Sequence, residues 1–187
     1  MIGYAFCGSF CTLRDSLLSL EVLSKSGEEI QPIMSPITYS SDTRFMTSEE
    51  LKSRVRTLTG REIIHTIEKA EPLGPAHPLE ILIIAPCTGN TLAKIANGIT
   101  DTAVTMAAKA HLRCDRPLLI ALASNDAMSQ NLQNISKLIS HRSVYFLPMK
   151  QDAPLKKPHS LVCEFDKIPF ALGEIRRGRQ LRPLFTV

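Results

Sequence analysis

Residues 81–105 read ILIIAPCTGNTLAKIANGITDTAVT. An apolar run ends at Ala85-Pro86, a short polar turn follows, and a helical segment then runs to Asn97-Gly98. A continuous apolar run, rather than an alternating one, is typical of a parallel strand covered on both faces. The turn carries hydroxyl and amide side chains just before a helix start, where free backbone N–H groups bind anions. The stretch therefore predicts a strand, a ligand-binding turn and a helix.

The same alternation of strand and helix runs through most of the chain. Strands are predicted at residues 2–6, 28–34, 79–85, 118–123 and 144–148. Helices are predicted at residues 13–26, 47–58, 61–69, 92–96, 101–113, 129–140 and 172–177, with a polar loop at 39–46 and irregular segments at 71–78 and 151–158. This pattern predicts an α/β fold with a Rossmann-like, doubly wound parallel sheet in three α/β/α layers. We expect one domain over residues 1–187, with its sheet core in 1–148 and a C-terminal extension over 149–187.

Composition limits the class of protein. The chain has 187 residues, of which 44% are hydrophobic and 21% charged, as expected for one globular domain. The net charge is +4, and the densest basic spots lack interleaved aromatic residues, so nucleic-acid binding is not expected. No apolar run approaches the ~18 residues of a membrane span, and no signal peptide is recognisable, so we expect a cytoplasmic protein without a membrane partner. The five scattered cysteines favour reduced thiols, and Cys87 is interpreted as a packing residue.

Small polar residues recur where the predicted strands end. They are Gly8 and Ser9, Ser35 and Thr38, Thr88, Asn90 and Thr91, and Ser124 and Asn125. Because the carboxyl ends of parallel strands meet at one edge of a sheet, these groups predict a pocket lined by neutral hydrogen-bond donors. Such a pocket suits a phosphate joined to a polar ring system. No cluster of carboxylates or histidines accompanies it, so no metal is expected, and the G-x-G-x-x-G dinucleotide fingerprint is absent.

Two of these turns resemble the motifs of a known family. Residues 85–101, APCTGNTLAKIANGITD, resemble the signature P-A-S-x-N-T…K-x-A-x-G-x-x-D of the homo-oligomeric flavin-containing cysteine decarboxylase flavoproteins. Residues 122–128, LASNDAM, are similar to the P-A-M-N-x-x-M segment of that family. The family includes phosphopantothenoylcysteine decarboxylase and the flavin prenyltransferases. The likeness covers most of residues 1–148.

This resemblance implies a bound flavin mononucleotide (FMN) and a role for each matched residue. The residues expected to contact the cofactor are Gly8, Ser9, Ser35, Thr38, Ala85, Pro86, Thr88, Thr91, Ser124 and Asn125. Gly8 and Ser9 would hold the flavin phosphate, whereas Ser124 and Asn125 would lie near the isoalloxazine ring. Asn90 would face the substrate side of the flavin, which makes it the candidate catalytic residue.

A narrower likeness covers nearly the whole chain. Residues 60–67, GREIIHTI, residues 105–113, TMAAKAHLR, and the segments 156–158 and 165–166 resemble flavoproteins that form one part of a two-component synthase in spore-forming bacteria. This likeness implies oxidation of dihydrodipicolinate to aromatic dipicolinate (pyridine-2,6-dicarboxylate) in the mother cell during sporulation. It also implies a partner protein that is related to nicotinamide-dependent dehydrogenases. Family members form trimers, often grouped as dodecamers, so we expect a homo-oligomer.

Two departures from the family pattern leave the reaction open. Leu122 replaces a family proline, and His65, in the segment between the second and third family strands, has surroundings that differ from those of the family histidine. Both argue against cysteine decarboxylation. An oxidising component of a synthase, a stand-alone decarboxylase or prenyltransferase, and a non-catalytic flavin scaffold for the partner protein all remain possible. The candidate ligands for substrate carboxylates are Lys94, Lys109, Arg113 and Arg116, each of which is more simply a surface base on a helix.

Overall fold

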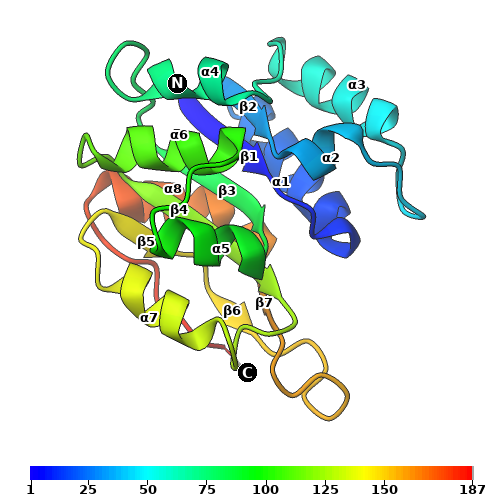
Figure 1. Cartoon of the computed structure of the whole chain (residues 1–187), viewed down its shortest axis with the longest axis vertical. Helices are drawn as coiled ribbons and strands as arrows, with labels where there is room; N and C mark the ends of the chain where they lie inside the picture. Colours follow the sequence, from blue (N-terminus) through cyan, green and yellow to red (C-terminus); the bar gives the residue numbers. More distant parts are fainter. Residues whose placement is uncertain (187) are drawn as a thin grey trace.

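The computed structural model describes residues 1–186 and contains one mixed, mostly parallel sheet (Figure 1). Its order is β2-β1-β3-β4-β7-β6, and β5 pairs with the first half of β4. The strands in this part of the chain are β1 (Ile2–Phe6), β2 (Ile30–Met34), β3 (Leu82–Cys87), β4 (Leu118–Ser124), β5 (Val144–Phe146), β6 (Met149–Lys150) and β7 (Leu161–Cys163). β1 to β5 pair in parallel, whereas β7 pairs antiparallel with both β4 and β6.

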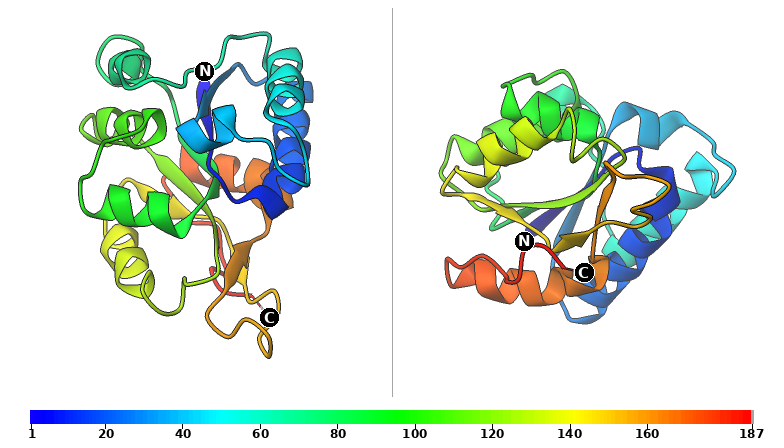
Figure 2. Two further views of the ribbon diagram at one scale, coloured as in Figure 1. Left: turned by 45° about the vertical axis from the view of Figure 1, so that its right-hand side comes forward. Right: turned by 90° about the horizontal axis from the view of Figure 1, so that it is seen from below.

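Helices cover both faces of the sheet, which confirms the predicted three-layer α/β/α architecture. The helices described in residues 1–186 are α1 (Leu13–Lys25), α2 (Pro36–Ser40), α3 (Ser48–Thr59), α4 (Ile67–Ala70), α5 (Gly89–Ala96), α6 (Ala103–Leu112), α7 (Leu132–Ile139) and α8 (Ile168–Arg176), with 3-10 turns η1 (Phe10–Thr12), η2 (Glu71–Leu73) and η3 (Phe165–Lys167). In the right-hand view of Figure 2, α1 and α8 lie on one side of the sheet and α5 to α7 on the other.

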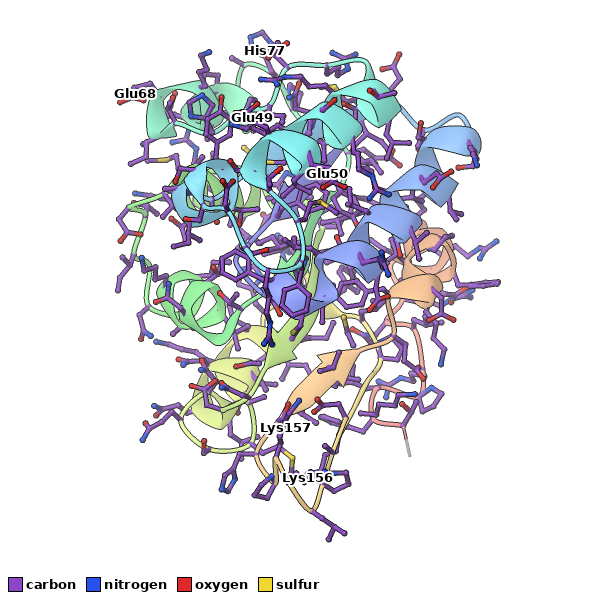
Figure 3. All side chains as sticks on the ribbon, turned by 90° about the vertical axis from the view of Figure 1, so that its right-hand side faces the viewer. Glu49, Glu50, Glu68, His77, Lys156 and Lys157 are labelled. Atoms are coloured by element: carbon purple, nitrogen blue, oxygen red, sulfur yellow. The ribbon has the colours of Figure 1, made fainter. Side chains whose placement is uncertain are left out.

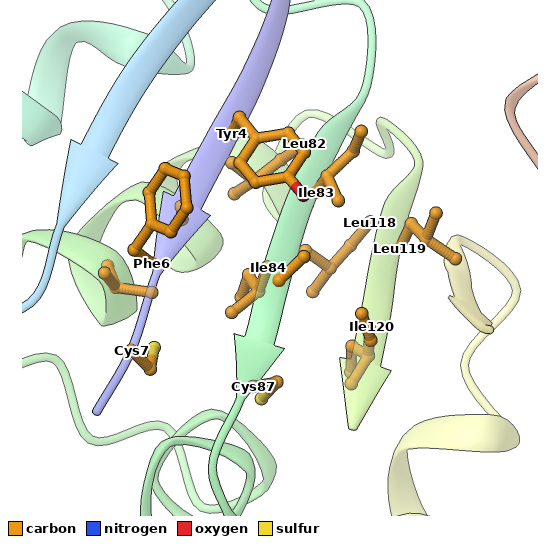
Figure 4. Packing of buried hydrophobic residues seen from close by; sticks show 14 of the residues in the cluster. Tyr4, Phe6, Cys7, Leu82, Ile83, Ile84, Cys87, Leu118, Leu119 and Ile120 are labelled. Carbon is orange, nitrogen blue, oxygen red and sulfur yellow. The ribbon is translucent and has the colours of Figure 1, made fainter. Parts of the chain in front are cut away.

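The core lies on both faces of β1, β3 and β4. Every residue of these three strands is buried, and Figure 4 shows large side chains such as Phe6, Ile84 and Leu119 packed across neighbouring strands. Burial of one such side chain stabilises the fold by roughly 1.5–3 kcal/mol. The continuous apolar runs of the sequence therefore reflect strands that are covered by helices on both sides.

Threonines fix the starts of several helices. Among the helices in residues 1–186, α3, α4, α5 and α6 begin at a threonine whose hydroxyl accepts a hydrogen bond from the backbone N–H three residues later. These N-caps are Thr47, Thr66, Thr88 and Thr102. An N-cap of this kind stabilises a helix by about 1 kcal/mol, because it satisfies a donor that the helix itself leaves free. The Thr88 cap is therefore what starts α5 directly after β3.

Residues 61–69 differ from the predicted helix. Residues 61–66 are not helical, and Ile64 forms a parallel bridge with Ile33 of β2. The Met34 N–H donates to the Ile64 carbonyl at 2.8 Å, and the Ile64 N–H donates to the Pro32 carbonyl at 3.0 Å. The apolar spacing at residues 63, 64 and 67 fits a helix, but pairing with the open edge of β2 satisfies the same backbone groups. Only the short α4 remains helical.

Three elements have no counterpart in the sequence prediction. The helix α2 begins at Pro36, in a stretch predicted as a strand end followed by loop. The strands β6 and β7 lie after residue 148, where no strand was predicted, and extend the sheet in antiparallel fashion. α8 also begins at Ile168, earlier than the predicted residue 172.

The connections set the place of a ligand site. The chain runs from β1 to β2 on one side and continues from β3 to β4 and β5 on the other. The carboxyl ends of β1 and β3 therefore form the point at which the direction of winding reverses. In open α/β sheets, ligands bind in the crevice at such a switch point.

Candidate functional site

Two adjoining cavities lie at the carboxyl ends of the strands. The larger has a volume of about 670 Å³ and the smaller about 360 Å³, and both are lined by Gly8, Thr88 and Asn90. The larger cavity is further lined by residues 9–12, Arg44, Phe45, Gly89, residues 123–126, Asp152, Lys157, Ser160 and Val162. The smaller is further lined by residues 35–37, Thr91, Lys94 and Thr102. Volumes of this size are typical of small-molecule and cofactor sites.

The loop after β1 approaches the second strand end closely. A Cβ added to Gly8 would lie 2.9 Å from Ile37 Cγ2, so a larger residue would force a shift of that neighbour. The Thr12 hydroxyl lies 3.0 Å from the Ser9 carbonyl oxygen and 2.9 Å from the Ser9 hydroxyl, and holds the loop in place. The 3-10 turn η1 separates this loop from α1, which begins at Leu13 as predicted.

The turn after β3 is tied to the end of β1. The Thr91 N–H donates to the Thr88 hydroxyl at 3.2 Å, and the two hydroxyls lie 3.1 Å apart. The Thr91 hydroxyl in turn donates to Cys7 Sγ at 3.3 Å. Gly89 and Asn90 occupy the first two positions of α5, where backbone N–H groups have no partner within the helix. Those two donors and the exposed Asn90 side chain are available to a ligand.

The two cysteines at these strand ends are not poised as nucleophiles. Cys7 and Cys87 lie at the carboxyl ends of β1 and β3 (Figure 4), and both are buried. Burial raises the pKa of the Cys7 thiol to about 11 and raises the pKa of Cys87 well above its ordinary value. Both groups are therefore neutral thiols at physiological pH, in agreement with the packing role expected for Cys87.

A hydrogen-bonded carboxylate organises the loop after β4. Asp126 accepts a hydrogen bond from the Ser124 hydroxyl and another, at 2.9 Å, from Asn131 Nδ2. Asn131 Oδ1 accepts from Asn134 Nδ2 at 2.9 Å, which anchors the group to α7. This arrangement holds Ser124 at the cavity wall. Asp126 was not predicted as a site residue, although it lies within the quoted LASNDAM segment.

Of the remaining expected cofactor residues, Ser35 lines a cavity, whereas Thr38, Ala85 and Pro86 do not. The Ser35 and Thr38 hydroxyls lie 2.9 Å apart; Ser35 lines the smaller cavity, and Thr38 is buried and lines neither. The Ala85 carbonyl accepts from Ser16 Oγ at 2.6 Å, and the Pro86 carbonyl accepts from the Cys7 N–H at 3.2 Å. Ala85, Pro86 and Thr38 therefore position the turns rather than form the cavity surface.

Two loops flank the larger cavity and contribute residues that the sequence analysis did not identify. The loop 41–47 contributes Arg44 and Phe45, and the loop 151–160 contributes Asp152, Lys157 and Ser160. Figure 3 shows Lys157 on the second loop, beyond the end of the sheet. Segment 156–158 carries part of the narrower likeness, but no spacing places these residues at the site, because each reaches the cavity through a loop rather than at a strand end.

The basic residues proposed for substrate carboxylates lie mostly elsewhere. Lys94 lines the smaller cavity and pairs with Asp101 at 2.7 Å. Lys109 and Arg113 line a separate hollow of about 330 Å³, and Arg116 donates to the Leu79 carbonyl at 2.9 Å. Three of the four therefore lie outside both cavities. They are bases on helix and loop surfaces, which was the simpler interpretation.

His65 also lies outside the cavity lining. Its ring stacks on Tyr39 with the ring centroids 3.8 Å apart, and the ammonium of Lys52 lies 4.5 Å from the Tyr39 ring centre on α2. His65 therefore packs against Tyr39 of α2, next to α3. This placement agrees with the departure of His65 from the family pattern that the sequence shows.

The donor set fits a flavin nucleotide better than a metal. In the part of the chain that the structure describes, no group of three histidine, cysteine, aspartate or glutamate side chains is arranged to hold a metal ion. Hydroxyls, amides and helix-start N–H groups instead surround the joined cavities, and such groups bind phosphate and a polar ring.

Across residues 1–186, no helix has the length and apolarity needed to cross a membrane.

The fold and this site define a flavoprotein. Residues 2–176 match the Flavoprotein family, and the chain belongs to that family. It is 40% identical over 185 residues to the B subunit of dipicolinate synthase from Bacillus subtilis (strain 168), which covers 99% of this chain and 92% of that protein. The crystal structure of the dipicolinate synthase B subunit from Bacillus halodurans C superposes with a TM-score of 0.91 at 36% identity, covering 100% of this chain and 95% of that one. These findings confirm the family and the narrower likeness predicted from the sequence.

More distant solved structures share the fold. The FMN-dependent cysteine decarboxylase SpaF has a TM-score of 0.66 at 21% identity, over 89% of this chain and 90% of that chain. AnUbiX, solved in complex with FMN and dimethylallyl pyrophosphate, has a TM-score of 0.63 at 22% identity, over 79% and 76% of the two chains. Membership in the flavoprotein family agrees with FMN, the cofactor expected from the sequence.

Proposed function

We propose that this chain is the flavoprotein component of a dipicolinate synthase and contributes to the oxidation of dihydrodipicolinate to dipicolinate. The observation that carries the proposal is the likeness to two dipicolinate synthase B subunits over almost the full length of all three chains. The polar cavities at the switch point between β1 and β3 support it. The proposal includes the dehydrogenase-like A subunit of dipicolinate synthase as partner, a homo-oligomer (trimer or dodecamer), and a place in the mother-cell cytoplasm during sporulation.

The chain's own residues supply binding and orientation for this reaction. Gly8, Ser9 and the start of α5 would hold the FMN phosphate, while Ser124 and Asn125 would lie beside the isoalloxazine ring. A bound flavin supplies a two-electron acceptor that matches the loss of a hydride from a dihydropyridine ring carbon. The Asn90 side chain offers both a donor and an acceptor to the substrate. Residues of the loops 41–47 and 151–160 line the larger cavity and would add charged and aromatic groups to its wall.

The first test is the absorbance spectrum of the purified chain. We expect a yellow protein that retains FMN, or one that takes it up in a titration. A colourless protein that ignores added FMN would refute the cofactor and, with it, the proposed function.

The second test separates catalysis from structural help. Dipicolinate formation is measured with the dehydrogenase-like partner on its own, with the partner plus this chain, and with the partner plus the Asn90→Ala variant. We expect the partner on its own to be slow, the pair to be fast, and the variant to fall at least tenfold while it still binds FMN. Gln133→Ala, an exposed position on α7, is the control. Full activity with Asn90→Ala would indicate a flavin scaffold, and turnover of a cysteine or prenyl phosphate substrate without the partner would indicate a stand-alone enzyme.

A further inference from the structure

The loop 41–47 holds an arginine and a phenylalanine at the wall of the larger cavity. The loop is closed around Thr43, whose hydroxyl accepts hydrogen bonds from the N–H groups of Phe45 and Met46, both at 3.2 Å. The Thr43 N–H and hydroxyl also donate to the Met46 carbonyl, at 3.1 and 3.0 Å. These four bonds across four residues order the turn. They therefore fix the point from which Arg44 and Phe45 extend.

The base of the loop is also fixed. Asp42 Oδ1 accepts a hydrogen bond from the Ser48 N–H at 2.8 Å, next to the Thr47 N-cap of α3. The guanidinium of Arg44 lies 4.8 Å from the centre of the Phe45 ring, within the range of a cation–π contact. The two side chains thus form one unit at the cavity wall. Both are exposed, so neither is there to fill the core.

The charges around the larger cavity single out Arg44. Lys157 is paired with Asp152, with 2.6 Å between Nζ and Oδ2. Asp126 is engaged by the Ser124 hydroxyl and the Asn131 amide. By contrast, none of the ion pairs within residues 1–186 involves Arg44, although it lines the same cavity. Arg44 is thus the cation at this wall whose charge is not already matched by a carboxylate of the described chain.

We propose that Arg44 and Phe45 form the recognition element for the carboxylate-bearing, planar substrate of this site. The guanidinium would bind one carboxylate through paired N–H donors, and the ring would pack on the heterocycle. The inference rests on the proposed function, because it takes a cyclic dicarboxylate as substrate. It replaces the assignment of Lys109, Arg113 and Arg116 to that role. Arg44 selects for charge, and Phe45 selects for a flat ring.

The test measures binding of the product rather than turnover. Dipicolinate is titrated by calorimetry into the FMN-loaded chain, and FMN affinity is measured separately for each variant. We expect Arg44→Ala to weaken dipicolinate binding at least tenfold and Arg44→Lys to restore part of it, because lysine keeps the charge but loses the planar fork. We expect Phe45→Ala to weaken it about twofold to twelvefold, as loss of one aromatic contact of ~0.5–1.5 kcal/mol implies. FMN affinity should change less than twofold in all three.

Arg54→Ala is the matched control, because this exposed arginine lies on α3, outside the cavity lining. Unchanged dipicolinate binding in Arg44→Ala, or a wild-type chain that binds FMN but no dipicolinate, would overturn the inference and leave the cofactor assignment standing. A chain without FMN affinity would refute the proposed function instead. The same calorimetry on the FMN-free chain then still tests Arg44, because the guanidinium belongs to the protein. If the wild type binds dipicolinate and Arg44→Ala does not, the inference is supported. If the two bind dipicolinate equally, it is refuted.

Discussion

Replacement of Gly89 by alanine tests how tightly the central turn is packed against the loop after β4. A Cβ at residue 89 would lie 2.5 Å from Ser124 Oγ, 2.6 Å from Asn131 Nδ2 and 2.6 Å from Asp126 Oδ1. All three distances are shorter than those at which Cβ atoms in proteins approach other heavy atoms. The same three side chains hydrogen-bond to one another, so the added methyl group separates partners that now satisfy each other.

The size of the effect follows from these contacts. Forcing a methyl group into a packed site costs about 1–3 kcal/mol. Each hydrogen bond to the Asp126 carboxylate is worth roughly 1.5–3 kcal/mol when it is lost, although water reaches this half-buried group and reduces the cost. The greater helix propensity of alanine returns less than ~1 kcal/mol at the first position of α5. We therefore expect Gly89→Ala to lower the free energy of unfolding by about 2–4 kcal/mol.

Urea denaturation of the FMN-free chain, followed by circular dichroism, measures this change, and an FMN titration of the folded variant measures its effect on the site. Gly173→Ala is the control: in the middle of α8, its Cβ would meet only Arg177 Nη1, at 3.9 Å, so we expect stability to be unchanged or raised by up to ~1 kcal/mol. If Gly89→Ala unfolds at the same urea concentration as the wild type and binds FMN equally well, the turn is not packed as described.

Two further predictions concern the core. The hydroxyl of Tyr4 lies 2.9 Å from the Ser16 carbonyl oxygen in a fully buried site. Tyr4→Phe should therefore lower the free energy of unfolding by about 1–2 kcal/mol, measured by urea denaturation. The control Tyr145→Phe, at a half-buried ring, should leave that free energy unchanged. Burial lowers the pKa of His111 to about 4, below the value near 6.5 of an unfolded chain, so the unfolded state takes up the proton first as pH falls. The stability that the neutral ring contributes is complete above about pH 6.5 and is lost toward pH 4. The urea midpoint of His111→Gln should therefore depend less on pH in that window than the wild-type midpoint does. An identical pH dependence of the urea midpoint in both proteins would contradict this.

The sheet was predictable where one physical cause dominates the local sequence. β1, β3 and β4 are buried on both faces, and their continuous apolar runs predict this burial. Residues 61–69 show the limit of the same signal. Three isoleucines at helical spacing fit a helix, but the backbone of Ile64 pairs with Ile33 of β2, which lies 31 residues earlier in the chain (64 − 33). Local spacing does not encode an edge that a distant strand leaves open.

The candidate site divides in the same way. Ser9, Thr88, Asn90 and Ser124 line the cavity as expected, because strand ends in a parallel sheet meet at one edge whatever their side chains. Whether they contact FMN stays a prediction. Arg44 reached the site through a loop, and the sequence offered only its charge, which it shares with many surface arginines. The expected set therefore covered most of the strand ends, but it missed Asp126 after β4 and the residues of the two loops.

The far side of β4 explains why the second loop could not be anticipated. β5 pairs with residues 118–120 of β4 and leaves the last part of that edge open. β7 fills it in antiparallel fashion, with Val162 opposite Ala123 and Leu161 opposite Ser124. That pairing carries the preceding loop, with Ser160 and Lys157, over the carboxyl ends of the strands. Because antiparallel addition reverses the chain at this edge, a segment outside the alternating pattern faces the same cavity as the turns after β1 and β3. The neutral floor of the site thus comes from the parallel core, and its charged rim comes from loops that the core does not specify.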